Sequence, residues 1–395
     1  MSATDLSRPA PALSRRAVRI AIWTPIGLAA SLAVIDQLAL WHVVASQGAR
    51  FVNGVFLFWG WSAFLHGHPA ALLYDHRVLH RFMAGLPGSP RRDLPFVYPP
   101  SALLFLWPVA WAAPVPSFIV WSAASFAAYV LASWRRDVRL ATLGLAAIVP
   151  STFDALFAGQ TALFAAALMI GACRALPRRP LLAGVLFGLL TVKPQYGVLV
   201  PVALLAARQW RAIAAAVATA LVLVVLGGVV FGWGGWLRLP LALAALSREV
   251  AADPRFAQFS PTFASGLRIL GLSGGIAMVL EAAVALAATA AIWVVFRRPF
   301  SPFAMAAMMA GAFLVTPYAA QYDLPVVSFA AWAFACAAWQ APGGISALEA
   351  GMVGLVALLP MLERAVAAPW GMVVLGPFFV LCIRRALRVP VPSPT

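Results

Sequence analysis

A lysine stands in the middle of an apolar stretch of the chain, in the sequence TVKPQYGVLVP at residues 191–201. On insertion scales a charged side chain at the centre of a bilayer costs roughly 2.5–3.5 kcal/mol, so such a residue usually faces protein or water and serves a function. Asp154 and Asp323 are also embedded among apolar residues, where a carboxylate needs a partner. Lys193, Asp154 and Asp323 therefore predict a polar cavity within a membrane region.

Further polar residues fall at interruptions between the apolar runs. Gln160, Gln195 and Asp75 lie in such interruptions, and we expect these segments on the outer side of the membrane. They predict that the cavity opens outward and is built from breaks in several helices. Asp93 and Asp253 lie in the same set of segments, and we interpret both as ordinary polar loop residues.

All five histidines fall between residues 42 and 80, and two of them, His76 and His80, are four residues apart. On a helix this spacing would put both on one face, which could suit a metal ion. The wet face of an amphipathic helix at the membrane surface, over residues 72–85, explains the same pattern, and we favour this interpretation. We therefore predict no metal site and no cofactor.

The composition fixes the class of protein. The chain has 395 residues, of which 63% are hydrophobic and 10% are charged. A soluble domain is about 45–50% apolar and about 25% charged. Because apolar runs of membrane-spanning length recur from end to end, we predict an all-α, polytopic transmembrane bundle.

The net charge of +16 comes from short arginine clusters that separate the apolar runs. Examples lie at 174–179, 208–211, 297–298 and 384–388. Such clusters are typical of the positive-inside signal of membrane proteins. No basic stripe with interleaved aromatic residues accompanies them, so the pattern argues against a nucleic-acid partner.

The interruptions divide the chain into a cytoplasmic tail (1–17), one multi-spanning membrane domain (18–388) and a C-terminal tail (389–395). Within the domain we expect a first outside loop at 45–100, which contains an interfacial helix, and a second outside loop at 233–272. The apolar runs lie at about 18–44, 101–133, 140–153, 161–173, 181–207, 212–232, 273–296, 302–316, 324–340, 347–362 and 370–387.

Two of these runs do not fit a single crossing. Residues 101–133 are too long and are interrupted by PVP at 114–116. Residues 181–207 have basic clusters at both ends, which one crossing would place on opposite sides of the membrane. Since Pro194 disfavours helix at the residue before it, we predict that this run enters from the cytoplasm, turns at KPQ and returns as two half-helices.

Several motifs, taken together and in order, resemble a known family. An aromatic stretch that ends in FW is followed by GHPAALLYD, VYPPSALLFLWP, GQTALFAAAL, LAGVLFGLLTVKPQYGVLVP and TPYAAQYDLPVV. This order resembles glycosyltransferase family 87, the polyprenol-phosphate-mannose-dependent mannosyltransferase-like proteins of the multi-spanning GT-C class. The resemblance covers roughly residues 50–340.

The resemblance implies an enzyme of the plasma (inner) membrane. It would move a hexose, mannose in the family's pattern, from a polyprenyl-phosphate donor to a lipid or glycan acceptor, with its active site outside the cytoplasm. A carboxylate would deprotonate the acceptor hydroxyl, and Lys193 would balance the leaving phosphate. The residues expected around the substrates are Lys193, Gln195, Gln160, Tyr98, Asp154, Tyr318 and Tyr322.

The chain departs from the family at one position. An aspartate usually stands a few residues before FW, but here the sequence reads RFVNGVFLFW, with Asn53 and Gly54. Asn53 is unable to act as a base. Another carboxylate, Asp75 or Asp323, would then take that role, or the alignment with the family slips at this position, or the chain is a catalytically inactive member. A flippase or transporter of lipid-linked sugars would also have broken helices and buried charges. We expect Lys193, Tyr98, Gln160 and Asp323 to converge on one cavity.

Overall fold

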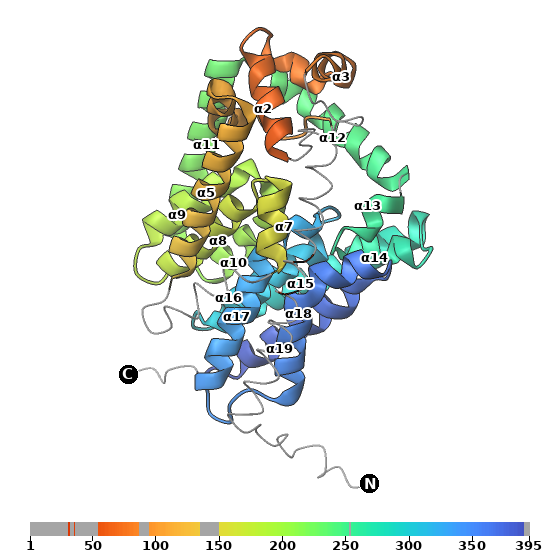
Figure 1. The fold of residues 1–395 in the computed structure, drawn as a ribbon. Helices are drawn as coiled ribbons and strands as arrows, with labels where there is room; N and C mark the ends of the chain where they lie inside the picture. The colour runs from red at the N-terminus through yellow and green to blue at the C-terminus, as the bar shows by residue number, and fades with distance from the viewer. Residues whose placement is uncertain are drawn as a thin grey trace.

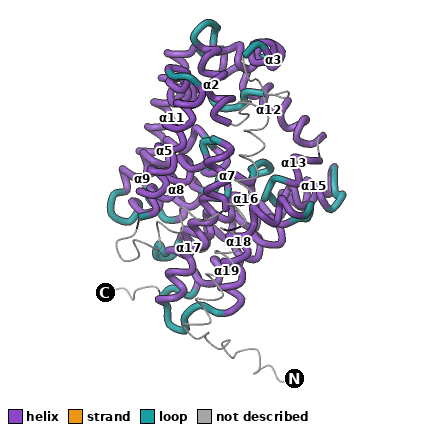
Figure 2. Tube along the Cα trace, in the orientation of Figure 1, coloured by secondary structure: helices purple, strands orange, loops and turns teal. Residues whose placement is uncertain are grey.

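The computed structural model describes residues Ser31, Ile35, 54–86, 95–134, 150–252 and 254–390, and within these it is all-helical (Figures 1 and 2). The described residues form 17 α-helices and several short 3-10 turns. The predicted fold class is therefore confirmed. Asn53, Asp93, Asp253 and nearly all of the predicted first helix lie outside the described residues.

The helices occur in the following order along the chain: α2 (Gly54–Leu65), α3 (His76–Ala84), α4 (Leu103–Leu106), α5 (Pro114–Ser133), α7 (Pro150–Ala158), α8 (Ala162–Ala175), α9 (Pro180–Leu189), α10 (Val200–Ala206), α11 (Trp210–Phe231), α12 (Gly234–Ala252), α13 (Pro254–Gln258), α14 (Phe263–Ile269), α15 (Gly274–Phe296), α16 (Pro302–Val315), α17 (Pro325–Gln340), α18 (Ala347–Ala365) and α19 (Gly376–Leu387).

Three helices, α5, α11 and α15, are long and apolar enough to cross a membrane, and seven shorter apolar helices accompany them in the described residues. The three long helices expose most of their apolar side chains; Val217, Leu221 and Val225 of α11, for example, are all more than 49% exposed. Apolar side chains that face outward along a whole helix are suited to lipid and unsuited to water. The chain is thus a multi-pass membrane protein.

Two segments differ from the sequence prediction. The interruption between the predicted apolar runs 140–153 and 161–173 is largely helical, because α7 continues to Ala158 and the chain turns only at Gly159, whose φ is +60°. Residues 233–272, expected as a loop, are mostly helical over α12, α13 and α14. In α12 the residues Ala242, Leu246 and Val250 are buried at helical spacing.

The predicted turn at KPQ is confirmed. Helix α9 leads into the short turns η5 (Leu190–Val192) and η6 (Pro194–Tyr196), and α10 then runs back. Pro177, which precedes α9, and Ala207, which follows α10, line the same hollow of about 570 Å³. Arg208, Arg297 and Arg298 line it too, so three of the basic turns meet at one end of the molecule, as the positive-inside pattern requires.

Close packing against α11 fixes the direction of α9. Gly184 and Gly188 are four residues apart and face Ala212, Ala216 and Thr219 of α11 without room for a side chain. Small residues at this spacing let two helix backbones approach closely, which is a common way to join helices in membranes. The end of α9, and with it the KPQ turn, is held in place by this contact.

The described part of the molecule has two apolar cores. The larger is centred on α8, α16, α17 and α19, and α16 is buried along almost all of its length. The smaller is formed by aromatic and aliphatic residues between positions 56 and 106, including Phe58, Phe64 and Phe96. In Figure 1, α2 and α3 lie at one end of the molecule and α19 lies towards the other. The cavity described next adjoins the smaller core.

Candidate functional site

Lys193 is buried at the break between α9 and α10, where it is 2% exposed. Its backbone is extended (φ −135°, ψ 72°), which ends η5 and turns the side chain away from the helix axis. The ammonium forms an ion pair with the carboxylate of Asp323. It also lies 5.2 Å from the ring centre of Tyr196 and 5.5 Å from that of Tyr322, within the range of cation–π attraction.

Asp323 is 1% exposed and is held from several sides. Its Oδ1 atom accepts a hydrogen bond from Lys193, and its Oδ2 atom accepts one from the backbone N–H of Ala320 at 3.0 Å. The hydroxyl of Tyr196 donates to the Asp323 backbone carbonyl at 2.8 Å. These contacts connect the KPQ turn to the segment that follows α16, and they offset part of the cost of burying two charges.

Around this pair lies a cavity of about 210 Å³. The residues that the sequence predicted for the substrate site and that line it are Tyr98, Gln160, Lys193, Gln195, Tyr318, Tyr322 and Asp323. The phenol of Tyr98 donates to Gln160 Oε1 at 3.3 Å, which joins the loop before α4 to the break after α7. The expected convergence of Lys193, Tyr98, Gln160 and Asp323 is confirmed.

Helix α2 and the segment before α4 cover one side of this cavity. Leu57 and Trp61 of α2 line it together with Pro95 and Val97. Trp61 packs edge-to-face on Phe96, with ring centres 5.0 Å apart. The aromatic stretch therefore forms a wall beside the polar groups.

Two predicted site residues that the structure describes do not line the cavity. Asp154 is buried in α7 and forms an ion pair with Arg364 of α18. Asp75 caps α3, where its Oδ1 atom accepts from the backbone N–H of Arg77 at 3.1 Å. Asn53 lies outside the described residues.

His76 and His80 lie on α3 with ring centres 6.0 Å apart. In the described residues no group of three or more histidine, cysteine or acidic side chains is placed to hold a metal ion. The described site chemistry therefore consists of an ammonium, a carboxylate, phenols and amides.

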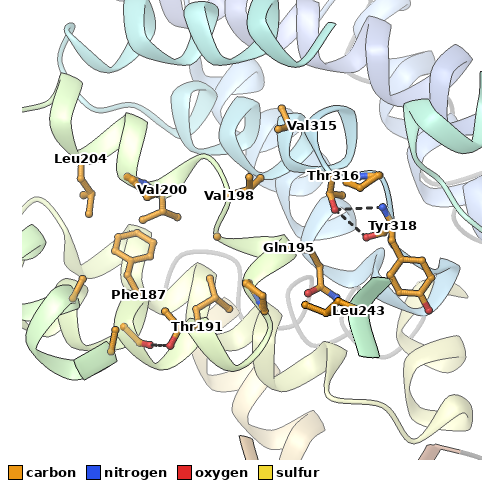
Figure 3. A pocket seen from close by; sticks show the side chains of 18 of the residues that line it. Phe187, Thr191, Gln195, Val198, Val200, Leu204, Leu243, Val315, Thr316 and Tyr318 are labelled. Atoms are coloured by element: carbon orange, nitrogen blue, oxygen red, sulfur yellow. Dashed lines mark hydrogen bonds between the residues drawn. The ribbon is translucent and has the colours of Figure 1, made fainter. Parts of the chain in front are cut away.

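An apolar groove of about 760 Å³ opens beside the cavity, and the sequence did not predict it (Figure 3). It runs between α9, α10 and α11 on one side and α12, α14 and residues 315–318 on the other. Gln195 and Tyr318 line both the groove and the cavity, so the two lie side by side. A molecule with an apolar tail and a polar head could therefore occupy both.

Comparison with protein-family models matches residues 96–317 to glycosyltransferase family 87. The match covers more than half of the chain. The chain belongs to glycosyltransferase family 87. As a member of this family it is a transferase that moves a sugar from a donor to an acceptor. No curated protein and no solved structure matches the chain.

The family 87 match includes Tyr98, Gln160 and Lys193 and ends just before Asp323. The structure brings Asp323 to the matched residues through its ion pair with Lys193. The polar groups of the cavity in this glycosyltransferase thus come from the matched residues and from Asp323, which follows them in the sequence. Burial raises the pKa of the Tyr98 phenol above its ordinary value, so its hydroxyl stays protonated and acts as a donor.

Replacing Tyr98 by phenylalanine is expected to weaken sugar transfer by about two- to tenfold. The change removes the hydrogen bond to Gln160 at the cavity wall, and a neutral hydrogen bond contributes about 0.5–1.5 kcal/mol. Steady-state transfer assays with the Tyr98→Phe glycosyltransferase would measure the change. An unaltered kcat/KM would mean that the Tyr98 hydroxyl contacts no substrate.

Proposed function

We propose that this glycosyltransferase moves a hexose, with mannose the first to test, from a polyprenyl-phosphate donor to a lipid or glycan acceptor. The observation that carries the proposal is the buried Lys193–Asp323 pair in a cavity that shares lining residues with an apolar groove. The groove suits an isoprenoid chain, and the cavity suits a sugar phosphate. Pockets of a few hundred cubic ångströms with few polar groups are typical of such ligands.

We propose Asp323 as the general base. The acceptor hydroxyl oxygen attacks the anomeric carbon, its proton passes to Asp323, and the bond from that carbon to the phosphate oxygen breaks. The polyprenyl phosphate leaves with the bonding electron pair. A positioned base of this kind typically contributes about 10²–10⁴-fold to a rate.

The ion pair gives this step a favourable charge balance. In the resting site the charges of Lys193 and Asp323 cancel. When Asp323 takes the proton it becomes neutral, and Lys193 is left as an unbalanced cation. At the same moment the phosphate changes from a diester to a monoester and gains a negative charge. An attraction that is strongest in the transition state raises kcat and not merely affinity.

We place the site on the outer face of the plasma membrane. The basic turns at Arg208 and Arg297 meet at the hollow at the far end of α10 from the KPQ turn. Because arginine clusters favour the cytoplasmic side, the KPQ turn and its cavity face the opposite side. The donor would then be presented from the outer leaflet.

Transfer by the purified chain is the direct test. Full-length protein in lipid nanodiscs is incubated with radiolabelled polyprenyl-phosphate hexoses and a membrane-lipid extract as acceptor. Labelled product in the acceptor fraction supports the proposal. Donor binding without turnover for every sugar would favour the inactive family member, in keeping with Asn53, and movement of labelled donor across liposomes would favour a flippase.

Asp75 provides a comparison between the two carboxylates. Asp75→Asn is expected to keep the transfer rate within about threefold and to keep α3 stable, because asparagine caps a helix as well as aspartate does. Asp75→Ala is expected to cost about 1 kcal/mol in the free energy of unfolding through loss of the cap. A loss of transfer of 10²-fold or more in Asp75→Asn would instead identify Asp75 as the base.

A further inference from the structure

The ion pair in the cavity supplies no net positive charge for the phosphate of the proposed donor. A polyprenyl-phosphate hexose is a phosphodiester with one negative charge. Lys193 is already paired with Asp323, so before reaction the pair offers no net positive charge. A second cation is therefore needed to bind the donor in its ground state, an argument that rests on the proposed function.

Arg268 of α14 is such a cation. It lines the apolar groove, as Thr316 and Tyr318 also do. Its Nη1 atom is buried and has no hydrogen-bond partner in the described residues. No carboxylate among those residues forms an ion pair with it. Buried polar groups are almost always satisfied, and an exception points to a missing ion or ligand.

The surrounding structure holds Arg268 in the groove. The side chain of Thr262 caps α14 by accepting from the backbone N–H of Ser265 at 3.1 Å. A side chain at Gly266 would collide with the sulfur of Met372, so this helix lies tightly against the residues before α19. The guanidinium therefore enters an otherwise apolar surface from a fixed backbone.

We propose that Arg268 binds the phosphate of a single-chain prenyl phosphate whose tail lies in the apolar groove. The groove is lined mainly by apolar side chains, which suit a prenyl tail, and Arg268 supplies a charge complementary to the phosphate. A guanidinium can donate two parallel hydrogen bonds to phosphate, which an ammonium is unable to do. Figure 3 shows Thr316, Gln195 and Tyr318 near one another on the groove, and Gln195 and Tyr318 also line the cavity that contains Lys193. We expect the head group to reach the cavity at these two residues.

This assignment gives the two cations separate tasks. Arg268 binds the donor before reaction, so its loss raises KM. Lys193 meets the charge that develops on the leaving phosphate, so its loss lowers kcat. A residue with only a structural role would not divide the kinetic parameters in this way.

Binding of a prenyl phosphate that carries no sugar tests the assignment. Full-length protein in nanodiscs is titrated with decaprenyl phosphate and, separately, with the uncharged alcohol decaprenol. Arg268→Gln is expected to weaken binding of the phosphate by at least tenfold and to leave binding of the alcohol unchanged. Arg268→Lys is expected to recover part of the lost affinity. Arg248→Gln, at an exposed arginine of α12 that does not line the groove, serves as the matched control and should bind as wild type.

Competition identifies the source of the phosphate. Labelled decaprenyl phosphate is first bound to the protein. Inorganic phosphate and the two-chain phosphatidylglycerol should displace it at least tenfold less well than unlabelled decaprenyl phosphate does. Equal displacement by either would overturn the single-chain assignment. Unchanged phosphate affinity in Arg268→Gln, or an equal loss for phosphate and alcohol, would overturn the role of Arg268. Binding that depends on Arg268 without any sugar transfer would retain this site and reject the proposed function.

Discussion

Replacing Lys193 by alanine is expected to lower the rate of sugar transfer by roughly 10²–10³-fold, the loss typical when one group that stabilises transition-state charge is removed. The same change leaves Asp323 as a buried carboxylate without its counter-ion. Breaking a buried pair by removing one partner costs about 3–5 kcal/mol in the free energy of unfolding. Single-turnover transfer and thermal unfolding of Lys193→Ala would measure the two losses separately.

The partner residue distinguishes catalysis from folding. Asp323→Asn keeps the shape of the side chain, and its amide oxygen can still accept from Lys193, so the stability loss should be smaller than in Lys193→Ala. Transfer should nevertheless fall by about 10²–10⁴-fold, because the amide is no base. The double variant Lys193→Met, Asp323→Leu should recover stability, since apolar replacement of a buried pair is often neutral or stabilising, but it should not recover transfer.

A second buried ion pair serves as the control. Arg385 donates to both oxygens of Glu349 at 2.6 Å, and neither residue lines the cavity or the groove. Glu349→Gln should lower the stability and leave transfer per folded molecule unchanged. If Lys193→Ala behaved in the same way, the Lys193–Asp323 pair would be structural and the proposed mechanism would be wrong.

The sequence predicted the helices and the polar meeting point because both depend on local signals. Long apolar runs predicted α11 and α15 within a few residues, and Pro194 predicted the break that carries Lys193. A buried charge must have a partner or a cavity, so Lys193 and Asp323 were expected together. The cause in each case lies within a short stretch of chain.

The features that were missed depend on distant contacts. The partner of Asp154 is Arg364, 210 residues away, and nothing in either local sequence indicates the pairing. The groove is lined largely by ordinary apolar residues, which look the same in a sequence whether they face lipid, core or ligand. Arg268 lies in the segment 233–272, which was expected to be an outside loop, and the packing of α14 in the fold places it on the groove.

The glycine pair of α9 carries the second large effect that we expect. A Cβ atom at Gly188 would lie 2.5 Å from Thr219 Cβ and 2.7 Å from the Ala216 carbonyl oxygen. Neither neighbour is a flexible side-chain end, so Gly188→Val would force α9 away from α11. Overpacking of this kind costs typically 1–3 kcal/mol and occasionally more. Because α9 leads directly to Lys193, transfer should fall by at least about tenfold even in the molecules that remain folded, since small misplacements at a reacting site can cost about 10²-fold.

Gly171→Ala is the matched control, because its new Cβ would meet only the end of the Leu186 side chain at 3.4 Å, an ordinary contact. Gly171 belongs to α8 and faces α9, so this variant tests whether any methyl group added against α9 has the same effect as Gly188→Val. We expect wild-type transfer and a change in stability within about 0.5 kcal/mol. Wild-type thermal stability in Gly188→Val would contradict the close approach of α9 and α11. A stability loss without loss of transfer would mean that the position of Lys193 does not depend on that approach, and the ion pair with Asp323 would then be the contact that holds the KPQ turn.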